Sequence, residues 1–249
     1  YLRRFHNQSR VTLVPSLSMR LDLEAAGYHN VEVIARGVDA NLFDPARRSQ
    51  ELRESWGVQG KGLAVIHVGR VAPEKNLPLL IRAFETIEAA RPDARLILVG
   101  DGPDLAALRA SHPRFVFRGV CRGEDLATHY ASSDLFLFPS LTETFGNVVL
   151  EAMASGLPQV CFNYAAAAEH VCHGETGLKV PYGDENDFLA KARHLATSTD
   201  LHRMGKAARE AALNQSWEHI FSRFEAVLVR IVMESEAHHE KDLFGMESA

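Results

Sequence analysis

Residues 140–151 read Ser140-Leu141-Thr142-Glu143-Thr144-Phe145-Gly146-Asn147-Val148-Val149-Leu150-Glu151. Before them lies Asp134–Phe138, an apolar run with the length of a strand. From Phe145 to Ser155 apolar residues recur at helical spacing, and Thr142 or Thr144 can serve as the helix N-cap. The pattern predicts a strand, a short loop and the N-terminus of a helix.

The start of this predicted helix is suited to bind an anion. Its first backbone amides lack partners within the helix and lie at the positive end of the helix dipole. Gly146 removes a side chain where a ligand has to approach closely. We therefore expect phosphate at the amides of Phe145, Gly146, Asn147 and Val148.

Two glutamates flank the predicted anion site. Glu143 precedes the helix, and Glu151 lies about one turn inside it. At about 1.5 Å per residue, Glu151 is about 6 Å from Asn147, which is about the separation of a ribose from its diphosphate. One carboxylate can then bind ribose hydroxyls while the other reaches past the phosphates. The alternative is that Glu143 caps the helix and Glu151 is a solvated surface residue.

Strands and helices alternate from Gly62 onward. The predicted strands cover residues 63–68, 95–99, 115–117, 134–138, 159–162 and 177–180, and the predicted helices cover 77–90, 104–110, 124–132, 185–197 and 201–214. This alternation indicates an α/β fold, a doubly wound parallel (Rossmann-like) sheet with helices on both faces. In the common strand order 3-2-1-4-5-6, the first and fourth strands are neighbours, and ligands bind beyond their carboxyl ends.

The first predicted strand leads into a second candidate segment, Gly69-Arg70-Val71-Ala72-Pro73-Glu74-Lys75-Asn76. Arg70 and Lys75 leave the strand end on a loop that Pro73 makes rigid. Two cations that face a helix N-terminus suit a diphosphate, and each charged hydrogen bond contributes about 1.5–3 kcal/mol. Taken singly, either side chain is more simply read as a solvated surface group.

The amino-acid composition narrows the classes of protein that fit this sequence. The chain has 249 residues, of which 46% are hydrophobic and 24% charged, as in a globular protein of one or two domains. A net charge of −5 argues against a nucleic-acid partner. No apolar run reaches membrane-spanning length, and the first residue is Tyr1 rather than Met, which suggests a fragment of a longer protein.

The three cysteines predict no metal site. Cys121, Cys161 and Cys172 have no ligand-like spacing and indicate buried thiols in a reducing cytoplasm. His170 and His173 lie beside Cys172, but nothing elsewhere in the sequence completes a ligand set. We therefore expect no metal.

Several of these motifs together resemble the retaining glycosyltransferases of family 4, which have the two-domain GT-B fold. The resemblance rests on two glutamates with seven residues between them around Phe145-Gly146, on Gly69-Arg70 with Glu74-Lys75-Asn76, and on the turn Gly100-Asp101-Gly102-Pro103. It covers nearly the whole chain. It implies that this chain is the C-terminal, donor-binding domain of a hexosyltransferase.

The resemblance also implies roles for individual residues. Arg70 and Lys75 would hold the diphosphate of a nucleotide sugar, Glu143 the transferred sugar, and Glu151 the ribose. Gly69 and the helix start from Phe145 to Val148 would line the sugar and phosphates, and Arg118-Gly119-Val120 resembles the segment that lines the base. In the family's proposed front-face mechanism the leaving phosphate assists the acceptor hydroxyl, so no enzyme base is expected in this domain. No metal cofactor is expected either, because Arg70, Lys75 and the helix amides would stabilise the charge on the leaving phosphate.

Domain boundaries follow from the same resemblance. Residues 1–37 would be the tail of an N-terminal GT-B domain with the linker, residues 38–231 the sugar-nucleotide-binding domain, and residues 232–249 a C-terminal tail. Because acceptor pockets in this fold are built mainly by the first domain, we expect these 249 residues to bind nucleotide without transferring sugar.

The donor is expected to be GDP-mannose rather than a UDP-sugar. Asn163-Tyr164-Ala165-Ala166-Ala167-Ala168 departs from the Gly-Gly turn common in the family and resembles a bacterial subgroup of lipid-directed mannosyl- and glucosyltransferases. A lipid or glycan acceptor, and a cytoplasmic protein with peripheral contact to the cytoplasmic face of the membrane, follow as expectations.

A doubly wound sheet also occurs in proteins of other functions. An NAD-binding module is disfavoured because the Gly100-Asp101-Gly102 turn lacks its third glycine, with Leu105 in that place, and follows the second strand rather than the first. A sugar-nucleotide epimerase or hydrolase of GT-B architecture stays open, as does a non-catalytic nucleotide-sugar-binding module.

Overall fold

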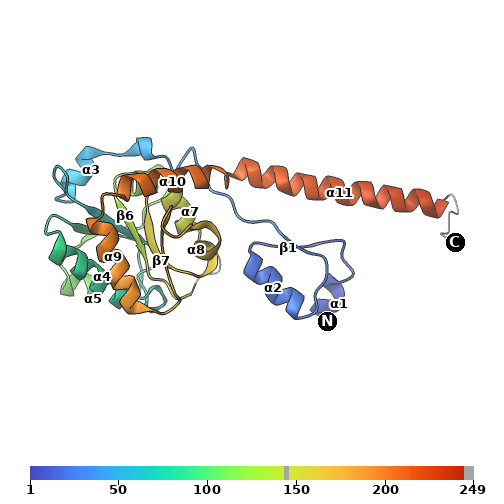
Figure 1. Ribbon diagram of the computed structural model, residues 1–249, viewed down its shortest axis with the longest axis horizontal. Coiled ribbons are helices and arrows are strands. Elements are labelled where there is room, and N and C mark those ends of the chain that lie inside the picture. Colours follow the sequence, from blue (N-terminus) through green and yellow to red (C-terminus); the bar gives the residue numbers. More distant parts are fainter. Residues whose placement is uncertain (143–145, 244–249) are drawn as a thin grey trace. The chain divides into compact units, whose positions relative to one another are not determined.

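The computed structural model describes residues 1–142 and 146–243, with side chains described as far as Glu236. It contains two compact units (Figure 1), one formed by Tyr1–Gly37 with Trp217–Ala249 and the other by Val38–Ser216. The domain limits expected at residues 37 and 231 stay predictions. None of the described helices is both long enough and apolar enough to cross a membrane.

The second unit is built on a six-stranded sheet in which every neighbouring pair of strands is parallel. The strands are β3 (Ala64–Val68), β4 (Arg95–Val99), β5 (Val116–Gly119), β6 (Leu135–Phe138), β7 (Gln159–Phe162) and β8 (Gly177–Val180). Their spatial order is β5-β4-β3-β6-β7-β8. In terms of this unit's first to sixth strands the order is 3-2-1-4-5-6, which confirms the predicted doubly wound fold.

Helices cover both faces of this sheet. Residues of α4 (Leu77–Ala90), α5 (Leu105–Ser111) and α9 (Glu185–Thr197) join one buried cluster. A second cluster takes in residues of α6 (Gly123–Ala131), α7 (Asn147–Ala154), α8 (Ala165–His170) and α10 (Leu201–Leu213), with Trp56 just after α3 (Gln50–Ser55). The short 3-10 helices η1 (Pro45–Arg47) and η2 (Pro73–Lys75) complete the unit.

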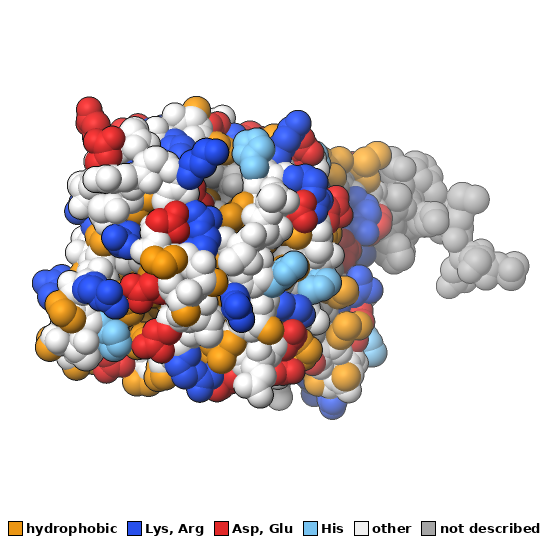
Figure 2. Space-filling model, turned by 60° about the vertical axis from the view of Figure 1, so that its left-hand side comes forward, with side chains coloured by type: hydrophobic (Ala, Val, Ile, Leu, Met, Phe, Trp, Pro, Cys, Tyr) orange, Lys and Arg blue, Asp and Glu red, His pale blue; other side chains and the backbone are white. Residues whose placement is uncertain are grey.

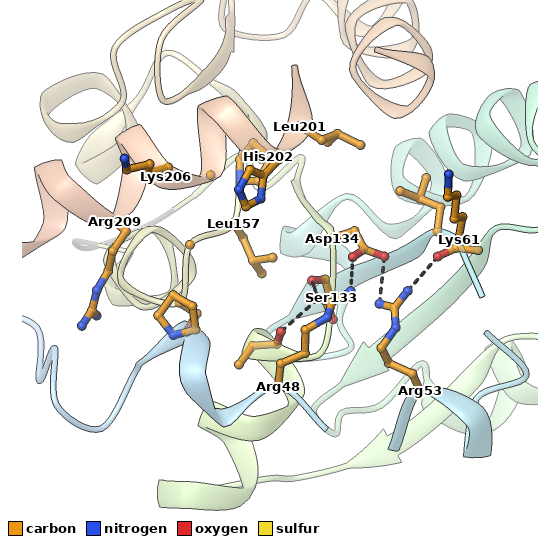
Figure 3. A pocket seen from close by; sticks show the side chains of 18 of the residues that line it. Arg48, Arg53, Lys61, Ser133, Asp134, Leu157, Leu201, His202, Lys206 and Arg209 are labelled. Atoms are coloured by element: carbon orange, nitrogen blue, oxygen red, sulfur yellow. Dashed lines mark hydrogen bonds and ion pairs between the residues drawn. The ribbon is translucent and has the colours of Figure 1, made fainter. Parts of the chain in front are cut away.

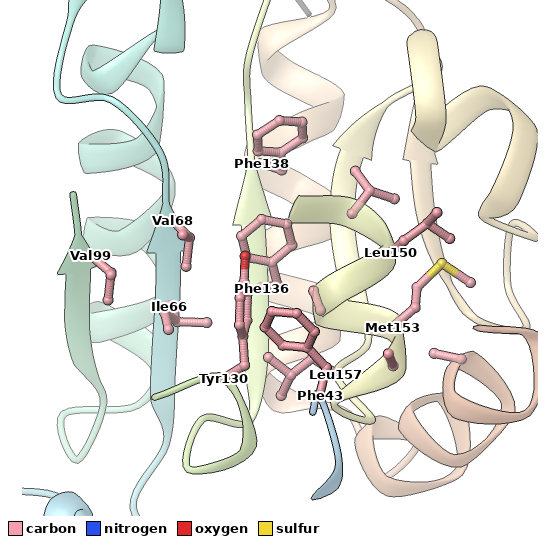
Figure 4. Close-up of a cluster of buried hydrophobic side chains, with 14 of the residues drawn as sticks. Phe43, Ile66, Val68, Val99, Tyr130, Phe136, Phe138, Leu150, Met153 and Leu157 are labelled. Atoms are coloured by element: carbon pink, nitrogen blue, oxygen red, sulfur yellow. The ribbon is translucent and has the colours of Figure 1, made fainter. Parts of the chain in front are cut away.

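Alternation along the strands divides side chains between the two clusters. In β3, Ala64, Ile66 and Val68 face the second cluster, and Val65 faces the first. Figure 4 shows Ile66 and Val68 beside Phe136 and Phe138 of β6 in the second cluster. Because both faces are covered, the central strands β3, β4 and β6 are mostly apolar rather than alternately polar.

The helix after residue 140 begins differently from the sequence prediction. The N-cap of α7 is Gly146, with φ 91°, and no side chain caps this end by a hydrogen bond among the described residues. The expectation that Thr142 caps the helix is therefore wrong, and the alternative cap Thr144 lies outside the described residues. A left-handed backbone turn, which glycine adopts without penalty, starts the helix in place of a side-chain cap. Glu143, Thr144 and Phe145 lie outside the described residues.

The first unit contains α1 (Leu2–His6), β1 (Thr12–Val14), α2 (Leu17–Ala25), β2 (Val31–Val33) and α11 (Trp217–Leu243). β1 and β2 are parallel, and α11 is joined to them by an ion pair of Arg230 with Glu32. Helix α11 runs to Leu243, through much of the segment from 232 onward where a tail is expected. Phe221 and Met233 on this helix are more than 60% exposed.

Candidate functional site

The carboxyl ends of the strands define the edge of the sheet at which the predicted site residues lie. Since the strands are parallel, the loops after β3, β4, β5 and β6 all leave at the same edge. These loops carry Gly69 and Arg70, the turn from Gly100, Val120, and the stretch from Pro139. β5 and β6 are three strand spacings apart, a span of about 14 Å.

The loop after β4 packs directly against the loop after β3. A Cβ on Gly100, which has φ +140°, would lie 1.9 Å from the carbonyl oxygen of Gly69, and a Cβ on Gly102 would lie 2.2 Å from that of Val71. The amide of Val71 donates to the carbonyl of Asp101 at 2.9 Å. The two glycines therefore allow a close approach that fixes the backbone on both sides of Arg70.

The two cations predicted to hold a diphosphate lie on this loop. Arg70 is exposed, and its Nη1 lies 3.1 Å from Oε1 of Glu74. Lys75 ends η2 and is half-buried, with Nζ 5.8 Å from the centre of the Phe138 ring at the end of β6. The next residue, Asn76, has φ 52° and turns the chain into α4.

The loops after β3 and β6 touch. The amide of Leu141 donates to the carbonyl of Glu74 at 3.4 Å. Neighbouring strand ends thus bring together the two segments that the sequence singled out. Just beyond, the start of α7 places Gly146 buried, Asn147 exposed and Val148 half-buried. Glu143 and Phe145, the other predicted residues of this stretch, are outside the described residues.

Glu151 lies in the middle of α7 and is half-buried. Its Oε2 accepts a hydrogen bond of 3.1 Å from the hydroxyl of Tyr130. Burial raises the pKa of the Glu151 carboxyl, and the Tyr130 hydrogen bond offsets part of that rise. The alternative that Glu151 is a solvated surface residue does not hold. No sequence pattern predicts the Tyr130 contact, which spans 21 positions and joins two elements.

The predicted base-lining segment is at the far end of this edge. Arg118 is exposed, and Val120 is 58% exposed just after β5. The Nε of Arg118 donates to Nε2 of His129 at 3.0 Å, and Nδ1 of that ring lies 2.7 Å from the carbonyl of Asp125. His129 thus supports Arg118 from within α6.

The structure also brings together Cys121, Asp125 and His129, whose potential ligand atoms lie within 4.8 Å of one another. This cluster was not predicted, although the four-residue spacing of its members was a signal. Cys121 and Cys161 are buried as expected, whereas Cys172 is exposed, so the expectation of a buried thiol is wrong for Cys172. Burial lowers the pKa of His129. Burial of Cys121 and its hydrogen bond with Asp125 raise the pKa of the thiol to about 12. Because Arg118 already occupies the His129 lone pair and the thiol keeps its proton, hydrogen bonding accounts for the cluster.

A cavity of about 680 Å³ lies at the opposite edge, before β3, β6 and β7, and no predicted site residue lines it. Figure 3 shows Asp134 between Arg48 and Arg53. Arg53 is buried, lies 2.9 Å from Asp134 Oδ2 and donates to the carbonyl of Gly62 at 2.7 Å. Arg48 donates to Ser133 O at 2.8 Å. These guanidinium groups bind the chain's own carbonyls and carboxylate, so they hold its loops in place.

The class of protein follows from the fold together with the family match. The doubly wound sheet of order 3-2-1-4-5-6 is the fold of solved GT-B glycosyltransferases. The chain belongs to the family of glycosyl transferases group 1, which matches residues 62–198.

Relatives of known activity agree with this family. The chain is 40% identical over 228 residues to a sulfoquinovosyl transferase of Arabidopsis thaliana, a match that covers 87% of this chain and 44% of that protein. It is 38% identical over 232 residues to a GDP-mannose-dependent alpha-mannosyltransferase of Mycobacterium tuberculosis, covering 91% and 59% respectively. The chain thus spans about half the length of the curated relatives it matches.

Solved structures establish the fold independently. The Anabaena protein Alr3699/HepE in complex with UDP has a TM-score of 0.79 at 24% identity, covering 92% of this chain and 66% of that one. A sucrose-phosphate synthase from Thermosynechococcus elongatus also has a TM-score of 0.79, at 23% identity, covering 94% and 61%.

Proposed function

We propose that this chain binds a nucleotide-sugar donor at the carboxyl edge of its sheet for retaining transfer of the sugar to an acceptor hydroxyl. The contact between the loop after β3 and the loop after β6 supports the proposal, because Arg70 and Lys75 lie on the first of these loops and the second leads into α7. In this proposal the two cations and the first amides of α7 bind the diphosphate, Glu143 binds the sugar and Glu151 the ribose.

The chemistry that this arrangement supports is departure of a nucleoside diphosphate. The bond from the anomeric carbon to the phosphate oxygen breaks, and the acceptor oxygen bonds to the same face of that carbon. The acceptor proton passes to the leaving phosphate. Negative charge grows on that phosphate, where fixed cations and amides stabilise it. Arg70 would exchange its ion pair with Glu74 for the phosphate.

GDP-mannose is the donor that we favour over UDP-sugars. The mannosyltransferase relatives, named as GDP-mannose-dependent, support this choice. Arg118 and Val120, exposed at the end of β5, are the side chains offered to the base. A lipid or glycan is the proposed acceptor, and a lipid would bring the protein to the cytoplasmic face of a membrane.

Calorimetry with the purified chain tests the proposal. Lys75→Ala should weaken GDP binding by about 10- to 150-fold, the equivalent of one charged hydrogen bond of about 1.5–3 kcal/mol. Lys61→Ala is the matched control, because Lys61 is an exposed lysine at the opposite edge of the same sheet. Equal losses of GDP affinity in both variants would contradict the role of Lys75. Tighter binding of UDP than of GDP would contradict the choice of GDP-mannose as donor.

Donor binding should not depend on a divalent metal. Arg70, Lys75 and the α7 amides supply the positive charge that a metal would otherwise bring to the diphosphate. Affinity for GDP is therefore expected to be unchanged in the presence of a chelator. A rise in affinity on adding magnesium or manganese, measured in the same calorimeter, would contradict this.

Product analysis separates the proposal from the other two enzymes of this architecture. Incubation with GDP-mannose and no acceptor should return the donor unchanged. A new sugar nucleotide would indicate an epimerase, and rapid release of free sugar would indicate a hydrolase.

A further inference from the structure

Tyr130 is a buried tyrosine whose hydroxyl meets a carboxylate of the proposed donor site. It lies in the last turn of α6 and has no exposed surface. Its hydroxyl donates to Oε2 of Glu151 at 3.1 Å. A phenylalanine would fill the same space, so packing alone does not account for the hydroxyl.

The Tyr130 ring is held on two sides. Phe43 contacts it edge to face with ring centres 5.8 Å apart at 77°, and Phe136 of β6 does so at 6.0 Å and 71°. Figure 4 shows the side chain running along β6, with its hydroxyl on the side toward Phe138, which is the carboxyl end of that strand. The ring therefore carries a fixed donor from α6 toward the ligand edge.

We propose that Tyr130 is a positioning residue, which holds Oε2 of Glu151 so that Oε1 faces the two ribose hydroxyls of the donor. This inference rests on the proposed function, because it assigns Glu151 to the ribose. A carboxylate with one oxygen held keeps the lone pairs of the other for an adjacent pair of hydroxyl groups. Tyr130 thereby sets the preference for ribonucleotides over nucleotides without those hydroxyls.

The protonation of the pair supports this geometry. Burial, with the charge of Glu151, raises the pKa of Tyr130 well above its ordinary value, so the phenol keeps its proton and acts as donor. Burial raises the pKa of Glu151, and the Tyr130 hydrogen bond is the influence that lowers it. No other charged side chain contributes to the shift of this carboxyl among the described residues. Loss of the hydroxyl leaves a buried carboxylate without that partner.

The test compares three ligands on the full chain by calorimetry: GDP, 2′,3′-dideoxy-GDP and pyrophosphate. The variants are Tyr130→Phe and Glu151→Gln, with Phe84→Leu as a control that perturbs the core on the other face of the sheet. We expect wild-type protein to prefer GDP over the dideoxy compound by about tenfold or more. In Tyr130→Phe this ratio should fall by about threefold or more, with pyrophosphate affinity changed by less than about twofold.

A spectroscopic measurement separates positioning from packing. With carboxyl-labelled glutamate, the NMR signal that disappears in Glu151→Gln reports the Glu151 titration. In Tyr130→Phe this titration should move to higher pH, because the hydrogen bond that lowers the pKa is gone. In Phe84→Leu it should stay in place.

The outcomes distinguish failure of the role of Tyr130 from failure of the proposed donor site. If Tyr130→Phe keeps the wild-type preference for GDP over dideoxy-GDP and Glu151→Gln abolishes it, the role of Tyr130 is overturned and the proposed donor site is retained. An unchanged ratio in Glu151→Gln removes Glu151 from the ribose and overturns both. Loss of the ratio in Tyr130→Phe but not in Phe84→Leu supports the inference.

Discussion

At Glu151, the charged carboxylate that would favour ligand binding also lowers the stability of the fold. Its half-buried carboxylate is proposed to bind ribose, yet burial disfavours the charged form and raises its pKa. The folded chain then holds this proton to a higher pH than the unfolded chain does. The free energy of unfolding therefore falls as the pH rises from the unfolded-state pKa of Glu151 to its folded-state pKa. Above the folded-state pKa, the full cost of burying the ionised carboxylate is present.

We expect Glu151→Gln to raise the melting temperature at pH 8 and to change it little near pH 4, because Gln removes the cost of burying a charge that is absent in acid. Thermal denaturation followed by circular dichroism at both pH values measures this. Glu85→Gln, at an exposed position of α4, is the matched control. A Glu151→Gln variant less stable at pH 8 than at pH 4, relative to wild type, would sink this interpretation.

At the scale of elements, the loops after β3 and β4 form one structural piece. Gly100 and Gly102 bring the second loop against the backbone of Gly69 and Val71. Arg70 lies between these contacts, so its place depends on residues about thirty positions later in the chain. The turn that resembled a family motif thus acts through packing beneath the proposed diphosphate loop.

Gly100→Ala should destabilise the fold by about 3 kcal/mol or more, because the new Cβ would meet a carbonyl oxygen at 1.9 Å and φ is +140°. Gly174→Ala is the control for backbone strain alone, since it has φ +81° with open space around the added Cβ. We expect it to cost about 1 kcal/mol. Urea denaturation of both variants measures the difference, and similar losses would show that the loop yields.

At the scale of the whole molecule, the two large buried clusters belong to one unit, and the other unit buries only a few apolar side chains, among them Val14, Val31 and Ile220. Both buried clusters consist of residues between 38 and 212, whereas α1 and α2 of the other unit contain no buried residue. The ends of the larger unit meet, because the amide of Val38 donates to the carbonyl of Gln215 at 2.9 Å. The larger unit therefore has its own core and adjacent ends, as an independently folding domain does.

A chain of residues 38–216 alone is expected to fold cooperatively and to bind GDP within about threefold of the 249-residue chain, a difference of about 0.7 kcal/mol. Its melting curve and calorimetric affinity check this directly. An unfolded fragment, or one that has lost GDP binding while staying folded, would show that the other unit supports the site.

Elements with strong local patterns could be predicted from the sequence. The predicted bounds of α4 and α9 agree with the structure, because apolar residues at helical spacing mark a buried face along a continuous segment. Leu77, Leu80, Phe84 and Ile87 of α4 are buried at this spacing. Local signals were weaker at the start of α7, where Gly146 rather than a threonine takes the cap.

Residue order alone determined the strand–helix alternation and the doubly wound class, because burial and chain connectivity leave few ways to arrange parallel strands. The meeting of the loops after β3 and β6 was expected only for the common strand order, which the tertiary structure decided. Only the tertiary structure decided the partners of individual side chains. The contacts of Tyr130 with Glu151, of Arg118 with His129 and of Arg53 with Asp134 each join different elements. Periodicity reports which face of an element is buried, but a hydrogen bond across elements depends on how those faces are placed in space.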